Sequence, residues 1–292
     1  MDNKYPLVHH PKQGFGIYQQ VSAKDAGWSH LHFEARLMKK GEQWRGDTGE
    51  NEYGFVLLGG NYSARTDKGS WKTVNGRKNV FSGIAHTLFL PRHSDFTITA
   101  ESEELDIAAG WCLADQDFPA KFKTPAEVAI EIRGGDNATR QINSLIEPGF
   151  GCSRIVAVEV YTPSGNWSSF PAHKHDERKV DAEGRLSEAV LEEFYFYKME
   201  MPQGYAIQQV YTGDGSLNEL MQIHNNDIVQ VPKGYHPVVA GHGYNCYYLN
   251  YLAGSDQSLA ATPDPKHNWI FNSWTGTDPR IPLVTASMNN SL

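Results

Sequence analysis

Short runs of β-branched and aromatic residues, each followed by turn-forming residues, recur along the whole of this 292-residue chain. Three of them are FVLL at 55–58 before two glycines, FYFY at 194–197 before Pro202-Gln203-Gly204, and YYLNY at 247–251 before Gly254. Runs of this kind between turn clusters are typical of β-strands. Convincing helices are few. The best candidate for a short helix is the segment 139–146, which ends at Glu147-Pro148-Gly149, and we predict that it connects two halves. The sequence therefore predicts an all-β fold.

The two halves of the chain carry a weak internal repeat. A glycine with a nearby tryptophan, then a strand, then a second apolar strand occur in the same order in each half. These features lie at 41–44, 53–58 and 86–93 in the first half and at 165–167, 193–197 and 227–236 in the second. We therefore predict two domains built from one β-unit, residues 1–148 and 149–292. The polar segment 181–187 is expected to be an insertion loop in the second copy.

Charge and hydropathy oppose several classes of partner. The chain has 26 Lys plus Arg and 34 Asp plus Glu, a formal charge of −8. Binding to nucleic acids or anionic membranes depends on clustered Lys and Arg, so neither partner is expected. No apolar run approaches the roughly 18–20 residues that span a bilayer, and the first residues lack the apolar core of a secretory signal. We therefore expect a cytoplasmic protein.

The cysteines predict no covalent or metal framework. Cys112, Cys152 and Cys246 are widely separated, odd in number and without a CxxC spacing. Such a set indicates neither a disulfide scaffold nor a zinc–thiolate site. We expect all three to be small buried side chains.

Three histidines and a glutamate in the second half form the strongest chemical pattern. His173 and His175 are two residues apart, and that spacing points both imidazoles to one face of a strand. Glu193 opens the next aromatic strand, and His236 follows a Pro-x-Gly turn at the start of a third. Glu192 competes with Glu193, but alternation from Glu193 places the tyrosines of FYFY on the inner face and its phenylalanines on the other. We predict that these four side chains converge inside a barrel.

Three imidazoles and one carboxylate suit a divalent metal of borderline character with open positions for substrate oxygens. Zinc or manganese is the first expectation, and iron, cobalt and nickel fit the same donors. In the first half, the position of the HxH pair falls in the segment 47–51, which contains no histidine. Elsewhere in that half, only His93 resembles a ligand. We therefore predict one metal site, in the C-terminal barrel.

The glycine turn, the HxH pair, the glutamate at the head of the next strand and the PxG-histidine segment resemble the two signatures of the cupin superfamily, whose members are small β-barrels or jelly rolls. Longer strings sharpen this resemblance. NWSSFPAHKHD at 166–176, LEEFYFY at 191–197 and VPKGYHPV at 231–238 are similar to the 5-deoxy-glucuronate isomerase family, a family of bicupins. RGDTGE at 45–50 and FLP at 89–91 extend the similarity over nearly the whole chain.

The resemblance implies an aldose–ketose isomerase of myo-inositol catabolism, which converts 5-deoxy-D-glucuronate to 5-dehydro-2-deoxy-D-gluconate. Such a reaction needs an electrophile for the enediolate and a group that moves the proton, unless a hydride shifts between the carbons. Asp176, Glu192 and Tyr205 are the candidates for the catalytic group, together with Tyr195 and Tyr197. The alternatives are a related isomerase of 4-deoxy-5-ketouronates, a metal-cupin dioxygenase, and a non-catalytic sugar-binding bicupin.

The resemblance also concerns the substrate carboxylate and assembly. The family often carries an arginine where this chain has Gln209. If that arginine binds the carboxylate, this chain must use another cation, such as Arg178, Lys179 or Lys198. A deoxyuronate is thus the expected small-molecule partner, and self-association into a homo-oligomer is expected at the level of the superfamily.

Overall fold

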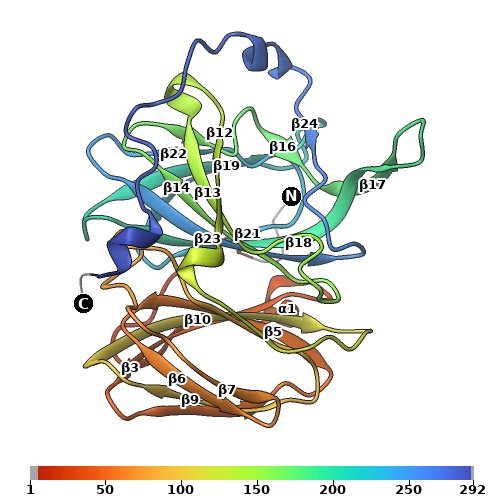
Figure 1. Ribbon diagram of the computed structural model, residues 1–292. Helices are drawn as coiled ribbons and strands as arrows, with labels where there is room; N and C mark the ends of the chain where they lie inside the picture. Colours follow the sequence, from red (N-terminus) through yellow and green to blue (C-terminus); the bar gives the residue numbers. More distant parts are fainter. Residues whose placement is uncertain (1–5, 291–292) are drawn as a thin grey trace.

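The computed structural model describes residues 6–290 and consists of two β-barrels stacked on one another (Figure 1). The N-terminal barrel, red to yellow, pairs a six-stranded sheet in the order β11-β8-β5-β10-β3-β2 with a four-stranded sheet in the order β4-β9-β6-β7. Its elements are β2 (Gly16–Val21), α1 (Ala23–Ala26), β3 (His32–Lys39), β4 (Gln43–Asp47), β5 (Asn51–Gly59), β6 (Tyr62–Thr66), β7 (Gly69–Lys72), β8 (Thr87–Leu90), β9 (Asp95–Ala100), β10 (Glu104–Leu113) and β11 (Lys121–Lys123).

The C-terminal barrel, mostly yellow-green to blue, has a large sheet in the order β1-β21-β18-β23-β14-β13-β12 with β17 beside β18, and smaller sheets β15-β22-β19-β20 and β16-β24. Its strands are β1 (Val8–His9), β12 (Ala129–Arg133), β13 (Arg140–Ile146), β14 (Val156–Thr162), β15 (Trp167–Ser168), β16 (His173–Lys174), β17 (Asp176–Val180), β18 (Leu186–Met199), β19 (Tyr205–Tyr211), β20 (Asn218–His224), β21 (Ile228–Val231), β22 (Val238–Ala240), β23 (Cys246–Gly254) and β24 (Thr262–Pro263). The described residues also include four short 3₁₀ helices: η1 (Pro125–Glu127), η2 (Asp136–Ala138), η3 (Asn268–Asn272) and η4 (Ala286–Asn290). The all-β, bicupin prediction is confirmed.

The helix predicted over 139–146 is wrong, because this segment forms strand β13 between β12 and β14. Ile142, Leu145 and Ile146 have a spacing that also fits a helix face. In the sheet, the buried Gln141 side chain forms hydrogen bonds with its neighbours. Its amide donates to the Asn143 side chain at 2.9 Å and to the Val284 carbonyl at 2.8 Å. Tertiary pairing thus overrides the local pattern.

Strands from the first half of the chain complete the C-terminal sheet. β1, β12 and β13 all precede residue 148, yet they pair with β21, β13 and β14. The division into domains 1–148 and 149–292 stays a prediction. The consequence for the site is that β12 and β13 form one wall of the C-terminal barrel.

The two faces of β18 serve different cores, as the alternation predicts. Tyr195 and Tyr197 lie in the apolar cluster inside the C-terminal barrel. Phe194 and Phe196 belong to the cluster between the barrels, where both rings contact Phe33 of β3. The segment 181–187, expected as an insertion loop, includes the turn of the hairpin that joins β17 and β18, and this hairpin projects from the barrel (Figure 1).

The interior of the N-terminal barrel is filled by apolar side chains. Trp44, Phe55 and Phe96 contact one another at ring-centroid distances of 5.1–6.0 Å. His93 lies outside this core with a side chain 56% exposed. The three cysteines are buried and free. Within residues 6–290, no helix is long and apolar enough to cross a membrane.

Candidate metal centre

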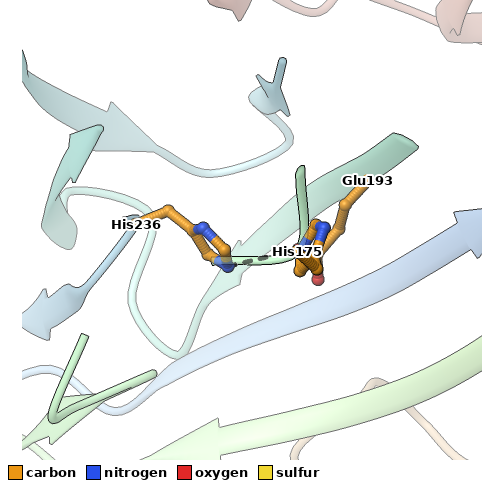
Figure 2. A group of neighbouring side chains, drawn as sticks. All are labelled: His175, Glu193 and His236. Atoms are coloured by element: carbon orange, nitrogen blue, oxygen red, sulfur yellow. Dashed lines mark hydrogen bonds and ion pairs between the residues drawn. The ribbon is translucent and has the colours of Figure 1, made fainter. Parts of the chain in front are cut away.

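Three of the four predicted ligands meet inside the C-terminal barrel (Figure 2). His175 lies between β16 and β17, Glu193 lies in β18, and His236 precedes β22. The Glu193 Oε2 atom is 2.8 Å from Nε2 of His175 and 3.4 Å from Nε2 of His236. All three side chains are buried, and their donor atoms lie within 4.8 Å of one another.

The fourth predicted ligand, His173, borders the same cluster. Its ring centroid is 4.8 Å from that of His236 and 6.4 Å from that of His175. His173 and Glu193 also line one cavity, so the fourth donor faces the same space as the carboxylate. The predicted HxH spacing therefore does bring both imidazoles to this cluster.

Hydrogen bonds fix the orientation of the cluster from outside. Nδ1 of His175 is 3.1 Å from the Leu191 carbonyl, and Nδ1 of His236 is 2.9 Å from the Gly234 carbonyl. In a neutral ring these contacts favour the tautomer with the proton on Nδ1, which directs each Nε2 toward Glu193 and the centre of the cluster. The Asn250 amide donates to Oε1 of Glu193 at 2.7 Å, which holds the carboxylate in place.

The electrostatics of the cluster fit a metal ion. Nε2 of His236 is buried without a hydrogen-bond partner in the described part of the chain, which is costly unless another group binds it. Burial lowers the pKa of His236 to about 4. Burial, with His236 and His175 nearby, also holds the pKa of His173 well below its usual value. At His175 burial disfavours the charged ring, but the contact with Glu193 outweighs burial and raises the pKa. Neutral imidazoles are the form that ligates metals, so His173 and His236 suit a divalent cation directly, and a cation between His175 and Glu193 would replace the proton that they share.

The cavity beside Glu193 carries hydroxyl groups and cations. Oγ of Ser169 is 3.1 Å from the Tyr195 hydroxyl and 3.3 Å from the Tyr248 hydroxyl. Arg140 of β13 and Arg133 of β12 line the same cavity. Aliphatic side chains, among them Ile142, Val158 and Leu252, complete the lining. An apolar cavity with a few hydroxyls and cations can fix the orientation of a small molecule that carries oxygens and negative charge.

Asp176 is adjacent to the cluster, but its carboxylate is engaged by neighbouring groups. One oxygen pairs with Lys174, and the other accepts the Gly234 amide at 2.7 Å. Because Asp176 follows His175 and Gly234 precedes Tyr235 and His236, this bond ties together the two chain segments that carry ligands.

Tyr205 begins β19, away from the ligand strands β16 and β18, and its ring contacts Tyr244 with a centroid distance of 6.2 Å. No contact between Tyr205 and the histidine cluster occurs among the described residues. The geometry therefore does not bring Tyr205 together with the predicted metal ligands.

Glu192 lies on the opposite face of β18 from Glu193 and points to the N-terminal barrel. Its carboxylate accepts the backbone amides of Ser29 at 2.7 Å, His30 at 2.9 Å and Leu31 at 2.8 Å. These charge-assisted bonds join the two barrels. The geometry thus gives Glu192 an anchoring position at the barrel interface.

Replacing Glu192 with alanine is expected to lower stability and leave turnover nearly unchanged. Loss of the carboxylate removes three bonds to backbone amides, which costs about 2 kcal/mol of unfolding free energy. Thermal unfolding and kcat of the purified variant measure the two effects. A loss of kcat of about 100-fold or more with unchanged stability would restore Glu192 as a catalytic group.

The cations proposed from the sequence as carboxylate anchors are paired elsewhere. Arg178 contacts Asp256, Lys179 contacts Glu188, and Lys198 contacts Asp106, with N–O distances of 3.3, 2.9 and 2.6 Å. None of the three lines the cavity beside Glu193.

Gln209 does not face the cavity either. Its amide donates to Asn218 at 2.9 Å, whereas the neighbouring Gln208 points inward and accepts from the Tyr197 hydroxyl.

The sequence pattern did not identify Arg140 as a residue of the cavity, because the segment 139–146 was predicted to be a helix. Alternation along a strand would have placed Arg140, Ile142 and Ser144 on one face.

The fold and the site together define a class of protein, the bicupins, with candidate metal ligands in one barrel. A variant of Bacillus subtilis oxalate decarboxylase has the same fold, with a TM-score of 0.62 at 11% identity over 90% of this chain and 80% of that one. More specifically, the chain belongs to the KduI/IolB family, whose model matches residues 7–270.

Relatives within this family are similar over nearly their full lengths. A 5-deoxy-glucuronate isomerase of Geobacillus thermodenitrificans is 34% identical over 93% of this chain and 97% of its own. One from Listeria monocytogenes is 32% identical over 91% of this chain and 96% of its own. The crystal structure of an IolB-like protein from Salmonella typhimurium has a TM-score of 0.86 and 34% identity, and covers 91% of this chain and 99% of that one.

Proposed function

We propose that the chain is a metal-dependent aldose–ketose isomerase that converts 5-deoxy-D-glucuronate to 5-dehydro-2-deoxy-D-gluconate, a step of myo-inositol catabolism. The convergence of His175, Glu193 and His236 inside the barrel carries this proposal. The near full-length similarity to proteins named 5-deoxy-glucuronate isomerase selects the reaction among those that metal cupins perform.

His173, His175, Glu193 and His236 would hold the divalent ion, with zinc or manganese as the preferred metal. When bound, such an ion supplies a Lewis acid for the carbonyl and the neighbouring hydroxyl of the sugar. Asn250 keeps the Glu193 carboxylate oriented. Asp176 acts as a positioning residue, because it holds the turn that leads to His236.

The phenols beside the cluster would act as hydrogen-bond donors. Burial raises the pKa of Tyr248 to about 12, and burial together with Glu193 holds the pKa of Tyr195 well above its usual value. Both phenols therefore stay protonated at neutral pH. With Ser169 between them, they can donate to substrate oxygens whose negative charge grows as the enediolate forms.

A cytoplasmic, self-associating enzyme completes the proposal. The net charge of −8 disfavours nucleic-acid and anionic-membrane partners, which leaves the deoxyuronate as the expected ligand. The edge strands of both barrels can support pairing between copies of the chain.

The test is a proton NMR assay of the purified protein with 5-deoxy-D-glucuronate in deuterium oxide. We expect the aldehyde signal to disappear and deuterium to enter the product, as proton transfer requires. Conversion without deuterium would indicate a hydride shift in the same isomerisation. Failure to convert this substrate, with turnover of a 4-deoxy-5-ketouronate or with oxygen consumption, would overturn the proposal in favour of a related isomerase or a dioxygenase. Failure with every substrate would favour a sugar-binding protein.

A further inference from the structure

Arg140 is a largely buried cation that forms no ion pair with a carboxylate of residues 6–290. It lies at the start of β13, lines the cavity beside Glu193, and donates from Nη1 to the carbonyls of Phe170 at 2.9 Å and Ala138 at 3.2 Å. Across residues 6–290, its Nε and Nη2 atoms have no hydrogen-bond acceptor, and no carboxylate forms an ion pair with it. Burial lowers the pKa of this guanidinium.

Two other enclosed cations, Arg77 and Lys174, are neutralised by carboxylates. The fully buried Arg77 is 2.5 Å from a carboxylate oxygen of Glu159. Lys174, whose side chain is 14% exposed, pairs with the buried Glu188 at 2.7 Å. A buried charge that lacks such a partner is costly, so a site that keeps one is arranged for a ligand of opposite charge.

A second arginine lies directly across the sheet. Arg133 of β12 is the register partner of Arg140 and lines the rim of the same cavity. Its own side chain already contacts Glu131, with Nε 2.7 Å from Oε1. The charge of Arg133 is therefore balanced by Glu131, and Arg140 is the arginine of the pair that has free donors.

We propose that Arg140 binds the carboxylate of the sugar-acid substrate, so that the carbonyl end of the molecule faces the histidine cluster. The inference rests on the proposed function for the identity of the substrate. A guanidinium offers two parallel N–H donors to a carboxylate, and Nε and Nη2 are the pair left open here. The hydroxyls of Tyr195, Tyr248 and Ser169 line the cavity that Arg140 shares with Glu193, which suits a chain of hydroxylated carbons.

The test compares two substrates on the metal-loaded enzyme: 5-deoxy-D-glucuronate and 5-deoxy-D-glucose, which replaces the carboxylate with a neutral hydroxymethyl group. For Arg140→Met, we expect KM for the uronate to rise by about 10- to 100-fold with kcat changed less than about threefold, since charge-assisted bonds to the ground state are lost. KM for the neutral sugar should stay the same. Arg140→Lys should fall between wild type and Arg140→Met.

Arg178→Met is the matched control, because Arg178 is an exposed arginine paired with Asp256 outside the cavity, and its KM for both substrates should be that of wild type. Equal losses on both sugars in Arg140→Met would overturn the inference and assign Arg140 a structural role through the Ala138 and Phe170 carbonyls. A ratio of the two KM values equal to that of wild type would also overturn it.

Binding calorimetry separates this inference from the proposed function. If wild type isomerises neither sugar, D-gluconate and its neutral counterpart D-glucitol serve as probes. Tighter binding of gluconate that is lost in Arg140→Met would support the carboxylate subsite although the isomerase proposal had failed. Equal binding of gluconate by wild type and Arg140→Met would refute the subsite.

Discussion

Substitution of His236 by alanine is expected to lower turnover by about 10³-fold or more and to remove most of the bound metal. His236 is fully buried, its Nε2 is 3.4 Å from Oε2 of Glu193, and that nitrogen has no hydrogen-bond partner within residues 6–290. Its alanine variant therefore loses a donor that no neighbouring group replaces. Metal content per chain and kcat of the purified variant measure the two losses together.

His242→Ala is the matched control for this substitution. His242 is exposed in the turn before β23, outside the barrel interior, and its loss should change neither metal content nor kcat. Full metal content and turnover in His236→Ala would contradict the assignment of His236 as a ligand. Because His175 and Glu193 still contact each other at 2.8 Å, the variant should remain folded, which circular dichroism can verify.

Substitution of Arg77 by methionine is expected to lower the free energy of unfolding by about 3–5 kcal/mol. Arg77 comes from the N-terminal barrel and is fully buried against Glu159 of β14. It also donates to the Leu57 carbonyl at 2.6 Å and to the Tyr161 hydroxyl at 3.1 Å. Arg77 and Glu159 join the two barrels. Removing the guanidinium leaves the buried Glu159 carboxylate without its positive partner. Denaturant unfolding of the variant gives the measurement.

The double variant Arg77→Met, Glu159→Gln tests the cause of this loss. It removes the uncompensated charge while Asn143 and Tyr247 can still bond the amide, so it should recover at least about 1 kcal/mol relative to Arg77→Met. A double variant less stable than Arg77→Met would show that the charge of Glu159 is not what destabilises the single variant.

The strand pattern and the metal-ligand candidates could be predicted because both depend on short-range rules. A spacing of two in extended chain predicts that His173 and His175 face one side, and both do border the cluster although His175 lies between β16 and β17. Alternation on β18 separates the inner Glu193 from the outer Glu192. The aromatic residues that follow Glu193 divide between the two cores in the same alternation.

Two features could not be predicted from the local pattern: Arg140 as the residue proposed to bind the substrate carboxylate, and the secondary structure of residues 139–146. The spacing of Ile142, Leu145 and Ile146 fits a helix, and only the pairing of β13 with β12 and β14 decides for a strand. Because this segment is a strand, Arg140 lies in the wall of the cavity beside Glu193. Likewise, the backbone amides that engage Glu192 come from a loop about 160 residues earlier in the chain, which no local spacing reveals.

Metal removal and return on the wild-type protein tests the central claim most directly. The protein is treated with a chelator, dialysed, and titrated with zinc or manganese while isomerisation of 5-deoxy-D-glucuronate is followed by proton NMR. The account predicts that the stripped protein is folded and inactive, and that turnover returns in proportion to bound metal up to one ion per chain. Full turnover by protein that elemental analysis shows to be free of metal would contradict it.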